Sequence, residues 1–309
     1  MEERRNYKVL FVDDDPLVRD MIGRYLSMDE RYEILVADSG NRALEILETS
    51  KVDLVLSDIN MPGIKGFDLL KIVKQKYPNV KRVLITAYNV EDYLDLALNY
   101  DIGNIFVKSV PFNFSELDII LNNLLEDNIF GLERHFGNDT EVHRFLVRRP
   151  DNLAECAQEI VSLVDDTERG KKLELVVVEL LTNAMFYGVR RENPENRQTW
   201  DFDFELSEEE AIEVAVASDS EKYAISVKDR GGQLKKQDVL YWLHRQIAQD
   251  DNGMPLGLFD THGRGLFIAR RYIDRLVVNI DRDRQTEVMI VNYLNQDYTG
   301  SKPIFINEI

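Results

Sequence analysis

Short apolar runs alternate with amphipathic segments through the first part of the chain. The apolar runs predict strands at VLFVD, EILVA, VDLVLSD, RVLIT and NIFVK. The segments between and after them have helical spacing of apolar positions and begin near Pro16, Ser39, Gly66, Asn89 and Phe112. Strands separated by helices in this way are typical of a parallel sheet that is covered on both faces. We therefore predict a doubly wound α/β domain with a five-stranded parallel sheet over residues 1–127.

The pattern changes in the second part of the chain. A strand, EVHRFLVRR, precedes a helix that opens at PDNLAE and a longer helix, KLELVVVELLTNAMFYG. Two hairpins, EAIEVAVASDSEKYAISVKD and LVVNIDRDRQTEVMIVNYL, flank a further helix that opens at HGRGLFIARRYIDRL. This order predicts an α+β sandwich over residues 139–294, with helices on one face of a mostly antiparallel sheet. Two glycines and an Asn-Asp pair place a linker at residues 128–138, and residues 295–309 are predicted to be a C-terminal tail.

Composition and charge narrow the classes of partner. The chain has 309 residues, of which 30% are charged, and its formal net charge is −18. Such a chain repels phosphate backbones and anionic membranes, so we expect neither a nucleic acid nor a membrane partner. The N-terminal residues show no signal peptide and no long apolar run follows, so we expect a cytoplasmic protein.

Acidic and basic side chains follow the predicted parallel strands. Ligand sites in such folds lie beyond the carboxyl ends of the strands, where Asp13, Asp14, Asp58, Thr86 and Lys108 would meet. Converging carboxylates repel one another unless a cation lies between them, and Mg²⁺ prefers oxygen ligands. A single aspartate at a strand end is more often a helix cap or a solvated loop residue. The five groups together indicate a phosphoryl-transfer site that forms an acyl phosphate on Asp58.

At this point the first domain resembles a known family. Residues 7–127 are similar to the receiver domain of two-component response regulators, through VLFVDDD, LVLSDINMPG, LITA and IFVK. The resemblance implies that Asp58 is the phosphoacceptor and that an upstream sensor histidine kinase supplies the phosphoryl group. It implies a Mg²⁺ site formed by Asp14, Asp58 and the Asn60 carbonyl, with Asp13 acting through metal-bound water.

The resemblance also implies a conformational switch made of Thr86 and Phe106. Thr86 would move toward the phosphoryl group, and Phe106 would enter the vacated space from the surface. One departure from the family lies after Lys108, where Ser109 and Val110 separate the lysine from Pro111. A cis peptide bond before that proline is therefore not implied.

The second domain carries a candidate nucleotide site. Glu179 and Asn183 are one helical turn apart, so their side chains share a face that extends to Tyr187. The asparagine oxygen can hold Mg²⁺ and the glutamate can deprotonate a nucleophile, although two solvated polar residues would give the same pattern. Asp229 of VKDRGG can accept a hydrogen bond from an exocyclic amine, although a tight turn also explains DRGG.

A glycine pair marks the start of the last helix of this domain. Gly263 and Gly265 would direct backbone N–H groups and the helix dipole at bound phosphates. Arg264 could add a charge-assisted contact. The irregular stretch before it, around residues 250–253, is typical of a lid.

In this order the motifs resemble the GHKL (Bergerat) ATPase superfamily, and within it the anti-sigma-factor serine kinases. The resemblance covers residues 139–294 through ELLTNA, VKDRGG and GRGLFIAR. It implies ATP and Mg²⁺ as cofactors and assigns Glu179 as general base, Asn183 as Mg²⁺ ligand and Asp229 as adenine contact. It also implies backbone contacts to the nucleotide from Gly231, Gly263 and Gly265. The chain departs from the family at Gln233, where a glycine is common, and at Tyr187, where this branch often has histidine.

The functional hypothesis joins the two domains. We expect a response regulator whose output is an ATP-dependent serine/threonine kinase acting on a partner such as an anti-sigma-factor antagonist. A histidine kinase is disfavoured, because neither His135 nor His143 precedes an acidic residue and no long helical hairpin fits between the domains. An alternative is a nucleotide-binding switch that sequesters a sigma factor or other partner without transfer. A homodimer is compatible with either.

Overall fold

A computed structural model of the chain describes residues 6–166, 168–192, 199–249, 254, 256–257, 264–294 and 302–309. The chain divides into two compact units, Met1–Ile129 and Phe130–Ile309. Within the described ranges, no helix combines the length and the apolar character that crossing a bilayer requires.

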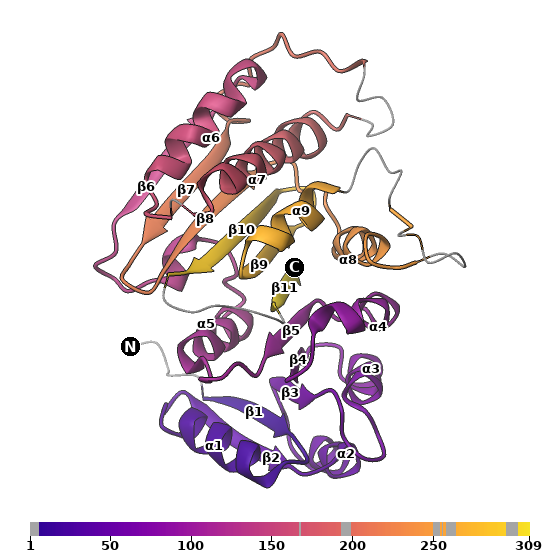
Figure 1. Cartoon of the computed structure of the whole chain (residues 1–309). Coiled ribbons are helices and arrows are strands. Elements are labelled where there is room, and N and C mark those ends of the chain that lie inside the picture. Colours follow the sequence, from indigo (N-terminus) through magenta and orange to yellow (C-terminus); the bar gives the residue numbers. More distant parts are fainter. Residues whose placement is uncertain are drawn as a thin grey trace. The chain divides into compact units, whose positions relative to one another are not determined.

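The first unit is a doubly wound α/β domain (Figure 1). Its strands are β1 (Tyr7–Val12), β2 (Tyr32–Ala37), β3 (Leu54–Asp58), β4 (Lys81–Thr86) and β5 (Asn104–Val107). They are all parallel and lie in the order β2-β1-β3-β4-β5. The helical segments are α1 (Pro16–Ser27), α2 (Gly40–Thr49), α3 (Gly66–Lys76), η1 (Val90–Tyr93), α4 (Leu94–Tyr100) and α5 (Phe114–Leu125). The predicted fold class of this unit is confirmed.

Side-chain burial explains why the strands of this sheet are apolar throughout. Every residue of β3 is buried, because helices cover both faces of the sheet. On one face α1 meets α5, where the Tyr25 hydroxyl donates to Asp118 at 2.5 Å. On the other face α3 packs against α2 and α4. Asp15 caps the first turn of α1 by accepting from the N–H groups of Leu17 and Val18.

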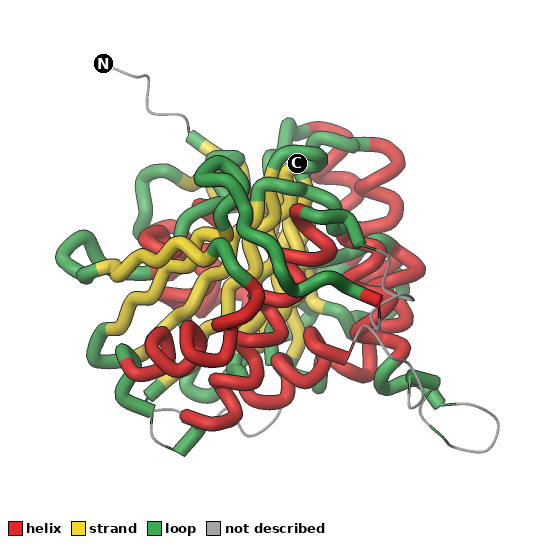
Figure 2. The backbone as a smooth tube through the Cα atoms, turned by 90° about the horizontal axis from the view of Figure 1, so that it is seen from above, coloured by secondary structure: helices red, strands yellow, loops and turns green. Residues whose placement is uncertain are grey.

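The second unit is an α+β sandwich built on a mixed sheet. Its strands are β6 (Val142–Val147), β7 (Ile212–Ser218), β8 (Lys222–Asp229), β9 (Arg275–Asp281), β10 (Gln285–Tyr293) and β11 (Ile304–Glu308). They lie in the order β6-β7-β8-β10-β9-β11, antiparallel except for the β9–β11 pair. In Figure 2 the strands of the chain are drawn in yellow and the helices in red. This part of the predicted fold class is also confirmed.

The helical segments of this unit form one main layer. They are η2 (Leu132–His135), η3 (Pro150–Asn152), α6 (Leu153–Ser162), α7 (Gly170–Thr182), the π-helix η4 (Asn183–Val189), α8 (Lys236–Arg245) and α9 (Arg264–Tyr272). Helix α7 is central, since it packs against both α6 and α9. The π-helix continues directly from α7 and contacts β8.

The C-terminal residues differ from the predicted tail. Ile304–Glu308 form β11, which pairs in parallel with β9, and the side chains of Ile304, Phe305 and Ile306 are buried. The Lys302 Nζ donates to the carbonyl oxygens of Arg270 and Arg271 at 3.2 and 3.0 Å, at the end of α9. The segment therefore adds a strand to the sheet beside β9. Its first residue, Lys302, also caps the end of α9.

Part of the predicted linker is also built into the second unit. The Gly131 N–H donates to Glu287 Oε2 at 3.1 Å, and Glu287 also accepts from Ser226 Oγ at 2.7 Å and from Asn279 Nδ2 at 3.0 Å. His135 is buried with its Nδ1 3.2 Å from Arg275 Nη2. Burial and the Arg275 charge hold the pKa of His135 well below its usual value, so the ring is neutral.

Candidate functional site

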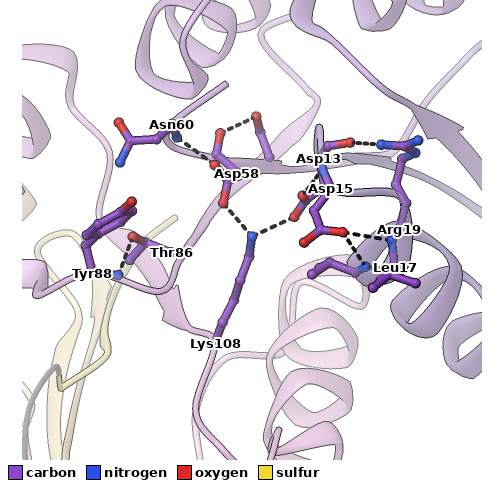
Figure 3. A network of polar contacts seen from close by, with 11 residues as sticks. Asp13, Asp15, Leu17, Arg19, Asp58, Asn60, Thr86, Tyr88 and Lys108 are labelled. Atoms are coloured by element: carbon purple, nitrogen blue, oxygen red, sulfur yellow. Dashed lines mark hydrogen bonds and ion pairs between the residues drawn. The ribbon is translucent and has the colours of Figure 1, made fainter. Parts of the chain in front are cut away.

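The ends of the parallel strands bring three charged side chains of the first unit together. Asp13 follows β1, Asp58 ends β3, and Lys108 follows β5. The Lys108 Nζ donates to Asp13 Oδ2 at 2.6 Å and to Asp58 Oδ1 at 2.5 Å (Figure 3). One lysine therefore joins two carboxylates that come from different strands, as the order of the sheet requires.

Burial and pairing set the protonation of this cluster. Burial raises the pKa of Asp13, and the hydrogen bond from Lys108 opposes that shift. Burial by itself lowers the pKa of Lys108, but its hydrogen bonds to Asp13 and Asp58 outweigh this, so the pKa lies above its usual value. A fixed ammonium charge therefore stands beside the Asp58 carboxylate.

Backbone and hydroxyl groups complete the surroundings of Asp58. Its Oδ2 accepts from the Asn60 N–H at 2.6 Å, and the carboxylate is nearly buried, with 7% of the residue exposed. Thr86, at the end of β4, is fully buried, and its Oγ1 accepts from the Tyr88 N–H at 3.0 Å (Figure 3). Asn60 thus lies in the loop after β3, and Thr86 lies at the end of the adjacent strand β4.

The oxygen atoms near Asp58 match the donor chemistry of Mg²⁺. Asp13 and Asp58 converge on Lys108, and the Asn60 carbonyl follows in the same loop as the N–H that binds Asp58. Asp14 is exposed, and the part of the chain described here contains no group of three His, Cys, Asp or Glu side chains placed to hold a metal. Lys108 thus joins Asp13 and Asp58, and the part of Asp14 in a metal site stays a prediction.

Phe106 occupies the inward one of the two positions between which the predicted switch would move it, and the switch itself stays a prediction. Its side chain is 1% exposed, and its ring lies 5.5 Å from that of Phe112, which is in turn 4.6 Å from that of Phe114. The aromatic residues at the start of α5 provide an apolar environment that favours the inward position. The Val110–Pro111 peptide bond is cis, although the sequence departs from the family at this loop.

In the second unit, the start of α9 lies against the Glu179–Asn183 pair. A Cβ atom added at Gly265 would stand 2.9 Å from Glu179 Oε2 and 3.3 Å from Asn183 Nδ2. Only a glycine allows this approach without displacing the carboxylate. Gly263, the Arg264 side chain and the predicted lid at residues 250–253 lie outside the described residues.

Asp229 ends β8 as a buried carboxylate. It is 5% exposed, and its Oδ1 accepts from the N–H groups of Gly231 at 2.8 Å and Gly232 at 3.3 Å. Burial raises the pKa of Asp229 to about 6, although these two hydrogen bonds favour the charged form. The loop VKDRGG therefore folds back onto its own aspartate.

Both units match known protein families. Residues 9–122 match the response regulator receiver domain, and residues 147–291 match the histidine kinase-like ATPase domain. The chain carries a receiver domain followed by a histidine kinase-like ATPase domain.

Individual relatives match over part of the chain. The chain is 34% identical over 119 residues to response regulator protein FleR of Pseudomonas aeruginosa, which covers 38% of this chain and 24% of that protein. It is 28% identical over 104 residues to transcriptional regulatory protein DegU of Brevibacillus brevis, which covers 33% of this chain and 44% of that protein. The chain thus spans less than half the length of these two curated relatives. A solved signal receiver domain of an HD domain-containing protein from Pseudomonas fluorescens Pf-5 is 29% identical, has a TM-score of 0.37, and covers 40% of this chain and 97% of that one.

The ATPase domain holds candidate residues that the sequence pattern missed. A Cβ atom at Gly188 would stand 2.6 Å from Asp229 Cγ, and one at Gly231 would stand 1.8 Å from the Gly188 carbonyl oxygen. Thr286 on β10 pairs in register with Asp229, and its buried Oγ1 has no hydrogen-bond partner among the described residues. The sequence gives only a weak signal for Gly188, which is a glycine near the end of a helix. It gives no signal for Thr286, because only the register of the strands places this residue beside Asp229.

The π-helix changes the face that follows Asn183. A π-helix has more residues per turn than an α-helix, so the predicted alignment of Tyr187 with Glu179 and Asn183 is not kept. The Tyr187 ring instead packs edge-on against the Trp200 ring, with the ring centroids 5.1 Å apart. Gln233, which replaces a family glycine, donates from Nε2 to the Gly231 carbonyl at 2.7 Å.

Proposed function

We propose that the chain is a response regulator in which phosphorylation of Asp58 controls an ATP-dependent serine/threonine kinase. The main support is the Lys108 ammonium, which donates hydrogen bonds to both Asp13 and Asp58 at the strand ends. Its fixed charge would attract a phosphoryl group to the Asp58 carboxylate. A sensor histidine kinase would be the natural donor.

The chemistry at Asp58 is the transfer of a phosphoryl group from a donor to the Asp58 carboxylate. An oxygen of the Asp58 carboxylate attacks phosphorus, a P–O bond forms, and the bond to the donor breaks with its electron pair leaving on the donor. The Asn60 N–H holds the carboxylate in place, and the Lys108 ammonium balances charge on the phosphoryl oxygens. Mg²⁺ bound by Asp13, Asp14, Asp58 and the Asn60 carbonyl would neutralise the incoming phosphoryl group.

Intact mass tests this assignment. The full chain is incubated with a small-molecule phosphodonor and Mg²⁺, and the mass is measured before and after, alongside Asp58→Asn. We expect the gain of one phosphoryl group in the wild type and none in the variant. An equal gain in Asp58→Asn would refute Asp58 as the acceptor.

The ATPase domain would transfer the γ-phosphoryl group of ATP to a partner hydroxyl. Asp229 would accept a hydrogen bond from the adenine amine, and Thr286 lies beside it with a free acceptor and donor. Asn183 would hold the Mg²⁺ of the nucleotide, and Glu179 would take the proton of the attacking serine or threonine. Gly231, Gly263, Arg264 and Gly265 would contact the phosphates, and an anti-sigma-factor antagonist is the proposed substrate.

A second candidate is a binding switch that holds nucleotide without transfer and sequesters a sigma factor or other partner. The Gln233 side chain favours it, because its bond to Gly231 fills a position at which the family has a glycine. Labelled ATP with candidate partners separates the two. Label on the partner that disappears in Glu179→Ala supports the kinase. A complex that needs ATP but gains no label supports the switch.

A further inference from the structure

A hydrogen bond joins the loop that follows the phosphoacceptor to the 3₁₀ helix that follows β4. The Asn60 Nδ2 donates to the Tyr93 hydroxyl at 2.7 Å. Asn60 lies in the loop between β3 and α3, and Tyr93 is the last residue of η1, which follows β4. The two residues are 33 positions apart in sequence, so the bond is a tertiary contact inside the receiver domain.

Asn60 has a part in the site that does not involve its side chain. Its backbone N–H donates to Asp58 Oδ2 at 2.6 Å, and its carbonyl is a proposed Mg²⁺ ligand. In Figure 3 the Asn60 side chain points away from the Lys108 ammonium. A contact between the Asn60 side chain and another element can therefore orient the backbone of this residue.

The loop that carries Asn60 is tightly packed at its far end. The Gly66 N–H donates to the Ile59 carbonyl at 3.0 Å, and a Cβ at Gly66 would stand 2.1 Å from the Asp58 carbonyl oxygen. Tyr93 is itself held in place, since its ring stacks on Phe67 of α3 with centroids 6.0 Å apart. The Tyr93 hydroxyl thus presents a well-placed acceptor to the tip of the loop.

We propose that Tyr93 is a positioning residue of the phosphoacceptor site. Through the Asn60 side chain it holds the loop after β3 so that the Asn60 N–H stays on Asp58 and the Asn60 carbonyl faces the metal. The inference rests on the proposed phosphorylation of Asp58 and adds a residue from the segment after β4. Its effect should appear first in Mg²⁺ affinity, because a misplaced carbonyl weakens a ligand set.

Tyr100 provides a matched control. Its ring also contacts Phe67, with centroids 5.7 Å apart, and its hydroxyl also makes a hydrogen bond, to Asp68 Oδ1 at 3.0 Å. That bond is on the surface and does not reach the Asp58 loop. Tyr93→Phe and Tyr100→Phe therefore each remove one hydroxyl from the same aromatic cluster, and only the first disconnects Asn60.

The experiment measures Mg²⁺ binding by calorimetry and the rate of phosphorylation as a function of Mg²⁺ concentration. We expect Tyr93→Phe to weaken Mg²⁺ binding about two- to tenfold, the range that one hydrogen bond supports, and to leave the rate at saturating Mg²⁺ unchanged. Tyr100→Phe should match the wild type in both. In an Asn60→Ala background, which keeps the backbone carbonyl, Tyr93→Phe should have no further effect.

The proposal would be overturned by unchanged Mg²⁺ affinity in Tyr93→Phe, by an equal loss in Tyr100→Phe, or by a Tyr93→Phe effect that persists with Asn60→Ala. A wild type that binds no Mg²⁺ would also overturn it. A wild type that binds Mg²⁺ but gains no phosphoryl mass would refute the proposed function instead. The binding titrations would still decide the role of Tyr93.

Discussion

At the scale of single residues, burial decides how Asp229 behaves. Gly188 and Gly231 lie against its carboxylate with no room for a side chain, and the Gly232 N–H donates to it. Burial raises its pKa to about 6, so the charged form costs more in the fold than in the unfolded chain. The protonated side chain therefore stabilises the fold fully at a pH below the ordinary pKa of an aspartate. This stabilisation is lost as the pH rises through about 6.

The same pKa predicts how ATP binding depends on pH. The charged carboxylate is the better acceptor for the adenine amine, so affinity should fall as the pH drops below about 6, by at most about tenfold per pH unit. Asp229→Asn should bind ATP about 1–3 kcal/mol more weakly at pH 8. Calorimetry between pH 5 and 8 measures both.

The asparagine variant is also the control for that titration. It retains any effect of protonating ATP itself, so the difference between the two proteins reports on Asp229. A constant difference across this range would show that the Asp229 carboxylate does not bind the base in its charged form.

Gly265 provides a second prediction at this scale. In Gly265→Ala the new Cβ would stand 2.9 Å from Glu179 Oε2, so the carboxylate must move. We expect transfer or hydrolysis to fall about tenfold or more, because a positioned general base contributes roughly 10²–10⁴-fold. ATP affinity should change less. Turnover and binding are compared with those of Gly170→Ala, whose Cβ would meet no atom within 4 Å. Equal losses in both variants would contradict a specific effect on Glu179.

At the scale of elements, β11 and α9 depend on each other. Lys302, just before β11, donates to the last carbonyls of α9, and the Arg270 Nη2 of α9 donates to the Lys302 carbonyl at 2.7 Å. The start of α9 carries Gly265, beside Glu179. A strand at the C-terminus of the described chain therefore helps to place a helix of the candidate nucleotide site.

Phe305→Ala tests whether this strand is part of the domain. Phe305 is 2% exposed, so its truncation should lower the free energy of unfolding of the ATPase domain by about 3–5 kcal/mol. Ile309→Ala, at a side chain that is 52% exposed, should change it by less than about 0.5 kcal/mol. Denaturant unfolding of the full chain measures both. A Phe305→Ala variant as stable as wild type would mean that the segment is a loose tail.

At the scale of the whole molecule, the connection between the domains is short. Helix α5 ends at Leu125, and six residues later the Gly131 N–H binds Glu287 on β10 of the second unit. Glu287 adjoins Thr286, which pairs in register with Asp229. The end of the connection is thus attached to the strand that lies beside the candidate adenine site. A short connection also keeps the two domains at high effective concentration.

We predict that phosphorylation of Asp58 changes ATP turnover or partner affinity in cis, by about 1–3 kcal/mol. The phosphoryl group adds close to two negative charges, and the loops after β3 and β4 should rearrange around it. Turnover and affinity are measured with and without a phosphate mimic, at concentrations where the oligomeric state does not change. Inserting a flexible Gly/Ser segment after Asp127 should reduce the coupling and preserve each domain's own activity. Identical values in both states would leave assembly as the route of regulation.

The sequence by itself determined the strand and helix order of the first domain and most of that of the second, where α8 and β11 were not predicted. It also determined the meeting of Asp13, Asp58 and Lys108, because parallel strands place their carboxyl ends at one edge and their apolar runs locate those ends. The pairing of Glu179 with Asn183 followed from helical spacing. These features depend on local periodicity and on one rule of topology.

Only the tertiary structure decided the remaining features. The inward Phe106, the bond from Asn60 to Tyr93 and the neighbouring positions of Thr286 and Asp229 each join segments that are distant in sequence. Strand β11 formed for the same reason, since a short apolar segment becomes a strand only where another strand offers an edge to pair with. Register and packing arise from contacts across the fold, and local periodicity carries no information about which segments will meet.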